Sequence, residues 1–245
     1  MILTSERLRV KLQGVMYSRL FHALRRVHLL ARHYLGISYD LSYTYVRHLP
    51  ADCTILDVGA NAGQSAIEFA RLRPDAKVVS FEANPDNLAD LAAVRRILGE
   101  RFTYHHVALS DRSGSGTLHV PVMGKTPVPG EASLQPELFS EVEERLGKIS
   151  RVIHYPVALR TLDSYNLAPH LVKIDVQGHE LSVLRGMVHT LEQHRPVLII
   201  ECGGDFEEVR RILENNDYGL YVYDVSNDCM TRLEGASAAQ FFALP

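Results

Sequence analysis

The stretch CTILDVGANAGQSAIEFARL, residues 53–72, decides the fold class of this chain. Its first residues, CTILDVG, form a short apolar run that predicts a buried strand, and its last residues, QSAIEFARL, have the periodicity of a helix. The glycines between the two parts allow a tight turn. A strand, a glycine-containing loop and a helix in this order are typical of the first unit of an α/β protein.

The same alternation continues along the rest of the chain. Helices are expected at 84–99, 179–194 and 205–216, with Asn84 as the N-cap of the first and Gly99 at its end. Further strands are expected at 76–82, 102–110, 171–176, 196–201 and 219–225. Because strand–helix–strand units connect with one hand, we predict an α/β fold with a Rossmann-like, doubly wound and mainly parallel sheet.

The composition is that of an ordinary globular protein. The 245 residues are 46% hydrophobic and 22% charged, and the net charge of −3 gives no general reason to expect nucleic acid as a partner. The three cysteines, Cys53, Cys202 and Cys229, lie far apart, which argues against disulfides and against a zinc–thiolate site. No apolar run reaches the ~18 residues of a membrane span, and arginines interrupt the N-terminus where a signal peptide would be apolar. A cytoplasmic location is therefore expected.

Residues 1–50 are expected to form a basic helical extension in front of a domain at 51–245. The extension has eight Lys or Arg and two acidic residues, so it carries +6 and the rest of the chain carries −9. Apolar residues recur on one side of a helix over residues 5–35, namely Leu12, Met16, Leu20, Leu24, Val27 and Leu35. Basic residues lie broadly opposite, namely Lys11, Arg25, Arg26 and Arg32.

This helix has several possible uses. It could pack on the domain or support homo-oligomerisation with its basic face in solvent, lie on a membrane surface, or cover an anionic substrate. Because the first strand starts only near Thr54, we expect binding of a cofactor to survive removal of residues 1–35.

The loop DVGANAGQS, residues 57–65, is the first candidate for a ligand site, since ligands of open α/β sheets lie beyond the carboxyl ends of the strands. It lacks the lysine of a Walker loop, and Asn61 and Gln64 stand where the dinucleotide fingerprint needs glycine. Residues 54–70 contain no Lys or Arg, whereas Asp57 and Glu68 are acidic. Such a loop suits a positively charged nucleoside, and S-adenosylmethionine is one. The candidate cofactor-binding residues here are Asp57, Gly59, Ala60, Asn61, Gly63, Gln64 and Ser65.

Two further strand ends supply cofactor candidates. Glu82, followed by Ala83, ends the second strand, where a carboxylate can accept hydrogen bonds from both ribose hydroxyls. A solvated strand-end carboxylate is the alternative. At the end of the third strand, Ala108 and Leu109 are expected to contact adenine, and Asp111 either meets the amino group of the base or belongs only to a hairpin turn.

Five segments together resemble the FkbM family of class I S-adenosylmethionine-dependent methyltransferases. They are ILDVGANAGQSAIEFA, SFEANP, VALSDRSGSGTLHV, TLDSY and LVKIDVQGHELSVLRG, and the resemblance covers residues 54 to about 201. It implies a seven-stranded methyltransferase sheet, usually with an antiparallel last strand. It also implies O-methylation of a hydroxyl on a sugar, a glycan or a glycosylated natural product, so the acceptor is expected to be a small molecule or a saccharide.

The segment KIDVQGHE, residues 173–180, is expected to hold the catalytic groups. Asp175 ends a strand beside the first one, and His179 is a natural general base because its unperturbed pKa is near ~6.5. Asp175 could be the base itself, orient His179 or hold the acceptor hydroxyl, while an inert His179 stays open. Glu201 is a third catalytic candidate. A magnesium site of Asp175, Glu201 and Asp205 is the alternative, but Gln177 replaces the usual family glutamate and weakens it, so no metal is expected.

The segment at 121–156 is rich in glycine and proline and is expected to be an irregular insertion or lid that holds the acceptor. Ser133 lies in GEASLQPELF, which resembles a serine-containing element of the family. Together with Gln177 and His154 it is a candidate substrate contact.

Two other functions remain open. One is a nicotinamide-dependent oxidoreductase on a related sheet, which the failed glycine fingerprint disfavours. The other is a catalytically impaired family member that binds the cofactor, in which Gln177 marks the lost function.

Overall fold

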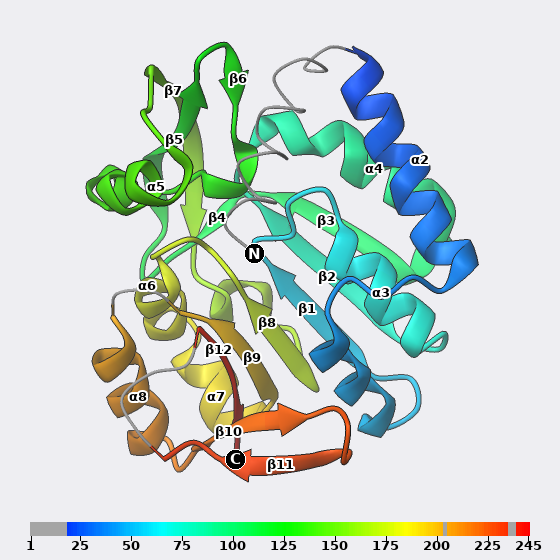
Figure 1. Ribbon diagram of the computed structural model, residues 1–245. Helices are drawn as coiled ribbons and strands as arrows, with labels where there is room; N and C mark the ends of the chain where they lie inside the picture. Colours follow the sequence, from blue (N-terminus) through cyan, green and yellow to red (C-terminus); the bar gives the residue numbers. More distant parts are fainter. Residues whose placement is uncertain (1–18, 203–204, 235–238) are drawn as a thin grey trace.

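The computed structural model describes residues 19–202, 205–234 and 239–245, and its centre is an eight-stranded sheet (Figure 1). The strand order is β11-β10-β12-β9-β8-β1-β2-β3. The strands span β1 Thr54–Val58, β2 Lys77–Glu82, β3 Phe102–His106, β8 Leu171–Ile174, β9 Val197–Glu201, β10 Gly219–Asp224, β11 Cys229–Arg232 and β12 Gln240–Leu244.

The pairing confirms the mainly parallel, doubly wound α/β sheet. Strands β3, β2, β1, β8 and β9 run parallel, and β12 pairs antiparallel with both β9 and β10. The antiparallel last strand implied by the family resemblance is therefore present. Strand β11 pairs antiparallel with β10 and adds an eighth, edge strand to the seven that were expected.

Helices cover both faces of this sheet. On one face, α3 Gln64–Leu72 and α4 Leu88–Leu98 bury a core that includes Ile67 and Leu91. On the other face, α6 Glu180–Arg185, α7 Val188–His194 and α8 Phe206–Asn215 bury a second core that includes Leu184 and Val209. The expected cap of the 84–99 segment is present, because the backbone N–H of Asp86 donates to Asn84 Oδ1 over 3.0 Å at the start of a short 3-10 turn, Pro85–Asn87.

The segment expected as one helix at 179–194 is broken into α6 and α7. Gly186 ends α6, and a Cβ at this position would lie 2.0 Å from the carbonyl oxygen of Ser110. The close approach of these two backbones explains why a glycine stands there.

The expectation of an irregular segment at 121–156 is wrong. Strands β4 Ala108–Leu109, β5 Gly114–Met123, β6 Thr126–Pro127 and β7 Arg151–Arg160 form a second sheet in the order β4-β7-β5-β6, and α5 Phe139–Leu146 lies between β6 and β7 in the chain (Figure 1). Strand β5 pairs antiparallel with β7 along nine residues, from Gly114–Leu159 to Val122–Arg151. The buried side chains of Leu118, Val120 and Val157 form a small core of their own. This non-local pairing overrides the loop-like local composition.

The N-terminal helix does not present the face that its sequence predicts. In α2 Arg19–Leu35, Val27 and Leu35 are 59% and 73% exposed, whereas Leu29 is 1% exposed. Arg25 and Arg26 turn inward and contact the buried carboxylate of Asp90, so the expected solvated basic face is wrong for these residues. Leu12 and Met16 lie outside the described residues, as do the side chains of Leu20 and Leu24.

Residues of the expected extension contribute to the core of the α3 and α4 face. Leu29 of α2, together with Tyr43 and Val46 of the 3-10 helix Leu41–His48, belongs to that cluster. The division at residue 50 stays a prediction, as do homo-oligomerisation and membrane-surface contact. Among the helices of the described ranges, none has the length and apolar character needed to cross a membrane.

Candidate active site

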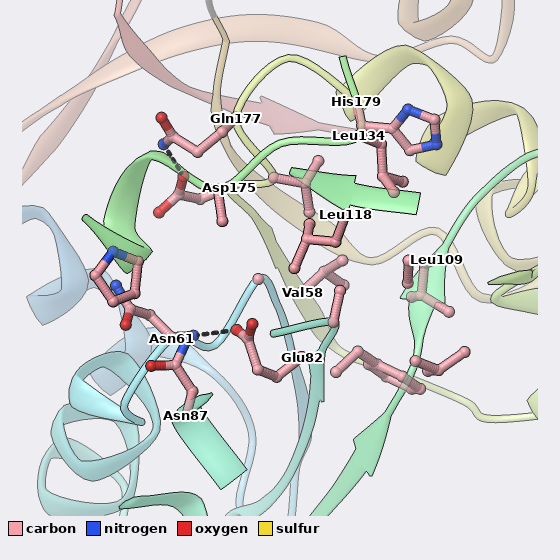
Figure 2. Close-up of a pocket in the computed structure, with 18 of the residues that line it drawn as sticks. Val58, Asn61, Glu82, Asn87, Leu109, Leu118, Leu134, Asp175, Gln177 and His179 are labelled. Carbon is pink, nitrogen blue, oxygen red and sulfur yellow. Dashed lines mark hydrogen bonds between the residues drawn. The ribbon is translucent and has the colours of Figure 1, made fainter. Parts of the chain in front are cut away.

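A pocket lies at the carboxyl ends of β1, β2 and β8, where open α/β sheets bind their ligands (Figure 2). We call it the sheet-end pocket. Its wall combines the loop after β1, the ends of β2 and β8 and part of the second sheet. Its lining residues are Val58, Gly59, Asn61, Phe81, Glu82, Ala83, Asn87, Val107, Ala108, Leu109, Leu118, Pro129, Gly130, Ala132, Leu134, Asp175, Val176, Gln177 and His179.

The loop after β1 packs directly on the end of β8. Gly59 has a φ of 77°, and a Cβ there would lie 1.8 Å from the carbonyl oxygen of Asp175. The backbone N–H of Gly59 donates to the carbonyl of Phe81 over 2.9 Å, which ties the same loop to β2. Only glycine permits this approach, so Gly59 sets the distance between the loop and Asp175.

Glu82 presents a buried carboxylate to the pocket. Its Oε2 accepts a hydrogen bond from the backbone N–H of Asn61 over 2.6 Å, and its Oε1 accepts one from that of Asn84 over 2.7 Å. Burial raises the pKa of Glu82 to about 7, although the two hydrogen bonds by themselves lower this pKa. The two backbone donors leave a further lone-pair direction on each carboxylate oxygen, and the Asn87 side chain also donates to this group, so Glu82 keeps acceptor capacity for a ligand hydroxyl.

Asp57 lies behind the pocket wall and not on it. It is fully buried, accepts a hydrogen bond from Ser65 Oγ over 2.7 Å, and its Oδ1 lies 3.5 Å from Lys173 Nζ. Lys173 Nζ also lies 3.2 Å from Asp175 Oδ2 and donates to the carbonyl of Gly59 over 3.0 Å. Burial alone would lower the pKa of Lys173, but the carboxylates of Asp175 and Asp57 raise it well above its ordinary value.

Asp175 and Gln177 lie together on one side of the pocket. The side-chain amide of Gln177 donates from Nε2 to Asp175 Oδ1 over 2.8 Å (Figure 2). The turn that follows has positive φ at Gln177 (52°) and Gly178 (96°). It is held by Glu180, whose Oε1 accepts hydrogen bonds from the backbone N–H groups of Val176 and Gly178 over 3.2 and 3.0 Å.

His179 lies across the pocket from Asp175, near Leu134 and in the same half of the pocket as Leu109 (Figure 2). Its Nε2 is 3.0 Å from Ser110 Oγ, and its buried Nδ1 has no hydrogen-bond partner among the described residues. Burial lowers the pKa of His179, which favours the neutral imidazole. Within the described residues, the Asp175 side chain contacts Lys173 and Gln177 and not His179, so of the three alternatives for Asp175 the orientation of His179 gains no support.

A second cavity adjoins the first and shares Gln177 with it. We call it the α5 cavity. It is lined by Glu131, Ser133, Leu138, Phe139, Glu141, Val142, Arg145, Gln177, Gly178, Glu180, Glu201 and Cys202. Glu201 is exposed within this cavity, yet desolvation by the surrounding protein and the charge of Asp175 raise its pKa to about 7. The buried Ser133 donates from Oγ to the carbonyl of Gln177 over 2.7 Å, which ties the second sheet to the site.

The structure brings part of the expected site together. Cofactor candidates that line the sheet-end pocket are Gly59, Asn61, Glu82, Ala83, Ala108 and Leu109. Those outside its lining are Asp57, Ala60, Gly63, Gln64, Ser65 and Asp111. Asp175, His179 and Gln177 also line this pocket, whereas Glu201 and Ser133 line the α5 cavity. His154 is an exposed residue of β7, its Nδ1 lies 3.0 Å from His119 Nδ1, and it lines neither cavity.

Sequence reasoning missed Asn87, Val176 and two larger groups of lining residues. Val58, Phe81 and Val107 stand at or beside strand ends, next to residues that were chosen as candidates in the sequence. Residues from 118–134 and from α5 reach the cavities through the β5–β7 pairing, which has no local signal. Within the described ranges, no group of three or more His, Cys, Asp or Glu side chains could hold a metal ion, so the magnesium alternative gains no support.

Comparison with known proteins gives consistent matches. Residues 57–220 match the family described as the methyltransferase FkbM domain. The hexuronic acid methyltransferase AglP of Haloferax volcanii is 27% identical over 185 residues, which cover 72% of this chain and 68% of AglP. The 2-O-methyltransferase NoeI of Sinorhizobium fredii is 31% identical over 157 residues, which cover 59% of this chain and 61% of NoeI.

A solved structure agrees on the fold. The methyltransferase FkbM from Methylobacillus flagellatus superposes with a TM-score of 0.54 at 19% identity, over 86% of this chain and 49% of that one. This chain therefore spans about half the length of the solved protein, and at this identity the likeness shows the fold alone.

Proposed function

The chain belongs to the FkbM methyltransferase family, and from this premise we propose that it transfers the methyl group of S-adenosylmethionine to a hydroxyl of a saccharide acceptor. The position of Glu82 carries the proposal. Its buried carboxylate faces the pocket at the end of β2, beside the tight loop after β1. The hydroxyls of a nucleoside ribose would need hydrogen-bond acceptors at this place.

The lining of the sheet-end pocket supports one orientation of the cofactor. The ribose hydroxyls would bind Glu82, and the adenine would contact the apolar surface of Ala83, Ala108 and Leu109. The methionine part would lie over the loop at Gly59. This orientation directs the sulfonium methyl group toward Asp175 and the α5 cavity. His179 would then lie near the adenine ring.

The α5 cavity supports the acceptor part of the proposal, because it meets the sheet-end pocket at Gln177. Since a sulfonium is already electrophilic, the protein has to align the acceptor hydroxyl and accept its proton. Glu201 suits the role of base, because a pKa of about 7 matches neutral pH. Asp175, held by Lys173 and Gln177, suits the role of orienting the hydroxyl.

Charge in the α5 cavity favours a neutral or amino-bearing saccharide over an acidic one. Among the described residues that line it, four are glutamates, Glu131, Glu141, Glu180 and Glu201. The lining arginine, Arg145, places its Nη2 2.5 Å from Glu131 Oε2. A carboxylate on the sugar would face like charge in this cavity. This part of the proposal differs from the substrate that the name of AglP gives for that protein.

Calorimetric titration with S-adenosylhomocysteine tests the cofactor proposal. We expect binding by the wild type and weaker binding by Glu82→Ala, by about 1.5–3 kcal/mol, because hydrogen bonds to a charged group are lost. Equal affinity of wild type and variant would refute the role of Glu82. Binding of a nicotinamide dinucleotide in place of S-adenosylhomocysteine would support the oxidoreductase alternative instead.

A further inference from the structure

An arginine of α2 reaches two residues that line the sheet-end pocket. Arg25 Nη2 donates to Asn61 Oδ1 over 2.7 Å and to Asn87 Oδ1 over 2.9 Å, and both asparagines line the pocket. The Arg25 side chain is 13% exposed, and its Nε lies 3.4 Å from Asp90 Oδ2. The N-terminal helix, which lies along α3 and α4 in Figure 1, is therefore in direct hydrogen-bond contact with the pocket wall.

Both asparagines in turn contact Glu82. The backbone N–H of Asn61 donates to Glu82 Oε2 over 2.6 Å, and a hydrogen bond from the Asn87 side chain to Glu82 lowers the pKa of that carboxyl. Figure 2 shows Asn61 and Asn87 close to Glu82 on one side of the pocket. An arginine that holds both side-chain carbonyls fixes the direction of both asparagines, because each Oδ1 then faces the guanidinium.

We propose that Arg25 is a positioning residue of the cofactor site, which holds Glu82 for ribose recognition through Asn61 and Asn87 and so makes α2 a functional part of this site. The proposal rests on the proposed function, because the ribose partner of Glu82 is S-adenosylmethionine there. It replaces the expectation that cofactor binding does not need residues 1–35.

The neighbouring arginine provides a matched control. Arg26 Nε lies 3.0 Å from Asp90 Oδ1, so it shares the same carboxylate with Arg25, but its hydrogen bonds do not include Asn61 or Asn87. Arg25→Gln and Arg26→Gln therefore remove the same charge from the same helix at the same buried aspartate. Only the first removes the link to the pocket.

The test is calorimetric titration of the full chain with S-adenosylhomocysteine across pH 6 to 9. We expect Arg25→Gln to weaken binding about tenfold at pH 7, which is the effect of one lost hydrogen-bond link of about 1.4 kcal/mol. Binding should require ionised Glu82, which is favoured by the charge of Lys173 and by the hydrogen bonds from the neighbouring asparagines. Without Arg25 to hold its Oδ1, the Asn87 side chain should donate less well to Glu82, which should move the pH midpoint of binding upward in Arg25→Gln. Arg26→Gln should keep the wild-type midpoint and affinity.

A double-mutant cycle with Glu82→Gln separates positioning from a general loss of stability. If Arg25 acts through Glu82, Arg25→Gln should change affinity far less in the Glu82→Gln background than in the wild type. Additive effects of the two substitutions, or equal affinities and midpoints for Arg25→Gln and Arg26→Gln, would overturn the proposal. A wild type that does not bind S-adenosylhomocysteine at all would instead refute the proposed function.

Discussion

The side-chain amide of Gln177 donates a hydrogen bond to Asp175 Oδ1 over 2.8 Å at the point where the sheet-end pocket meets the α5 cavity. Lys173 lies 3.2 Å from the other oxygen of the same carboxylate. Asp175 is thus held from both sides, by Gln177 at one oxygen and by Lys173 at the other.

Gln177→Glu should lower kcat about tenfold while the affinity for S-adenosylhomocysteine stays near that of the wild type. A glutamate cannot donate to Asp175 when ionised, and it places a like charge beside it, so the carboxylate that orients the acceptor loses its position. Steady-state kinetics with saturating cofactor measures the effect. Turnover equal to or above that of the wild type would show that the amide has no such role.

Glu201→Gln should lower kcat by ~10²–10⁴, the usual contribution of a general base. Because Glu201 must be ionised to accept a proton, the wild-type rate should rise as the pH passes through about 7, and the variant should lose this rise. Glu141→Gln is the control, since Glu141 lines the same cavity. Similar pH–rate profiles for Glu201→Gln and the wild type would move the base elsewhere.

Asp175→Asn and His179→Ala should separate the two sides of the sheet-end pocket. Asp175→Asn should mainly lower kcat, whereas His179→Ala should mainly weaken cofactor binding, because His179 bonds Ser110 on the side of Leu109. Kinetics and calorimetry on both variants give the comparison. A large loss of kcat in His179→Ala with unchanged cofactor affinity would restore His179 as the catalytic base.

Glu82→Gln should change how stability depends on pH in the absence of ligand. The folded-state pKa of Glu82, about 7, lies above its ordinary value of 4.5, so the folded protein binds this proton more tightly than the unfolded chain does. Stability is therefore lost as the pH rises from about 4.5 to about 7, by at most about 3 kcal/mol. Urea unfolding at pH 5 and pH 8 should show that the free energy of unfolding of the variant, relative to that of the wild type, is higher at pH 8 than at pH 5. A constant difference would contradict the raised pKa.

Local signals predicted much of the fold. The helix expected from QSAIEFARL is α3, Gln64–Leu72, and Asn84 caps the following segment as expected, since both depend on residues within a few positions of each other. The second sheet could not be predicted in this way. Strand β5 contains Gly114, Gly116 and Pro121, which locally favour a loop, and its stability comes from pairing with β7 far along the chain.

The candidate site shows the same limit. Residues 54–70 contain no Lys or Arg, but two basic side chains from elsewhere in the chain reach that loop. Lys173 bonds Gly59, which lies 114 residues earlier, and Arg25 bonds Asn61, which lies 36 residues later. Asp57, chosen as a carboxylate for a cationic ligand, is buried against Lys173 instead. Strand-end residues such as Glu82 could be placed, because the order of parallel strands brings their carboxyl ends to one edge.

Methyl transfer itself tests the central claim most directly. The purified full chain would be incubated with S-adenosylmethionine labelled in its methyl group and, separately, with neutral, amino-bearing and hexuronic acid saccharides, and the label on each saccharide would be measured. We predict label on a hydroxyl of a neutral or amino-bearing saccharide, with Glu82→Ala and Glu201→Gln as inactive or strongly impaired controls. Tight binding of S-adenosylmethionine without transfer to any saccharide hydroxyl would contradict the claim and would favour a catalytically impaired family member.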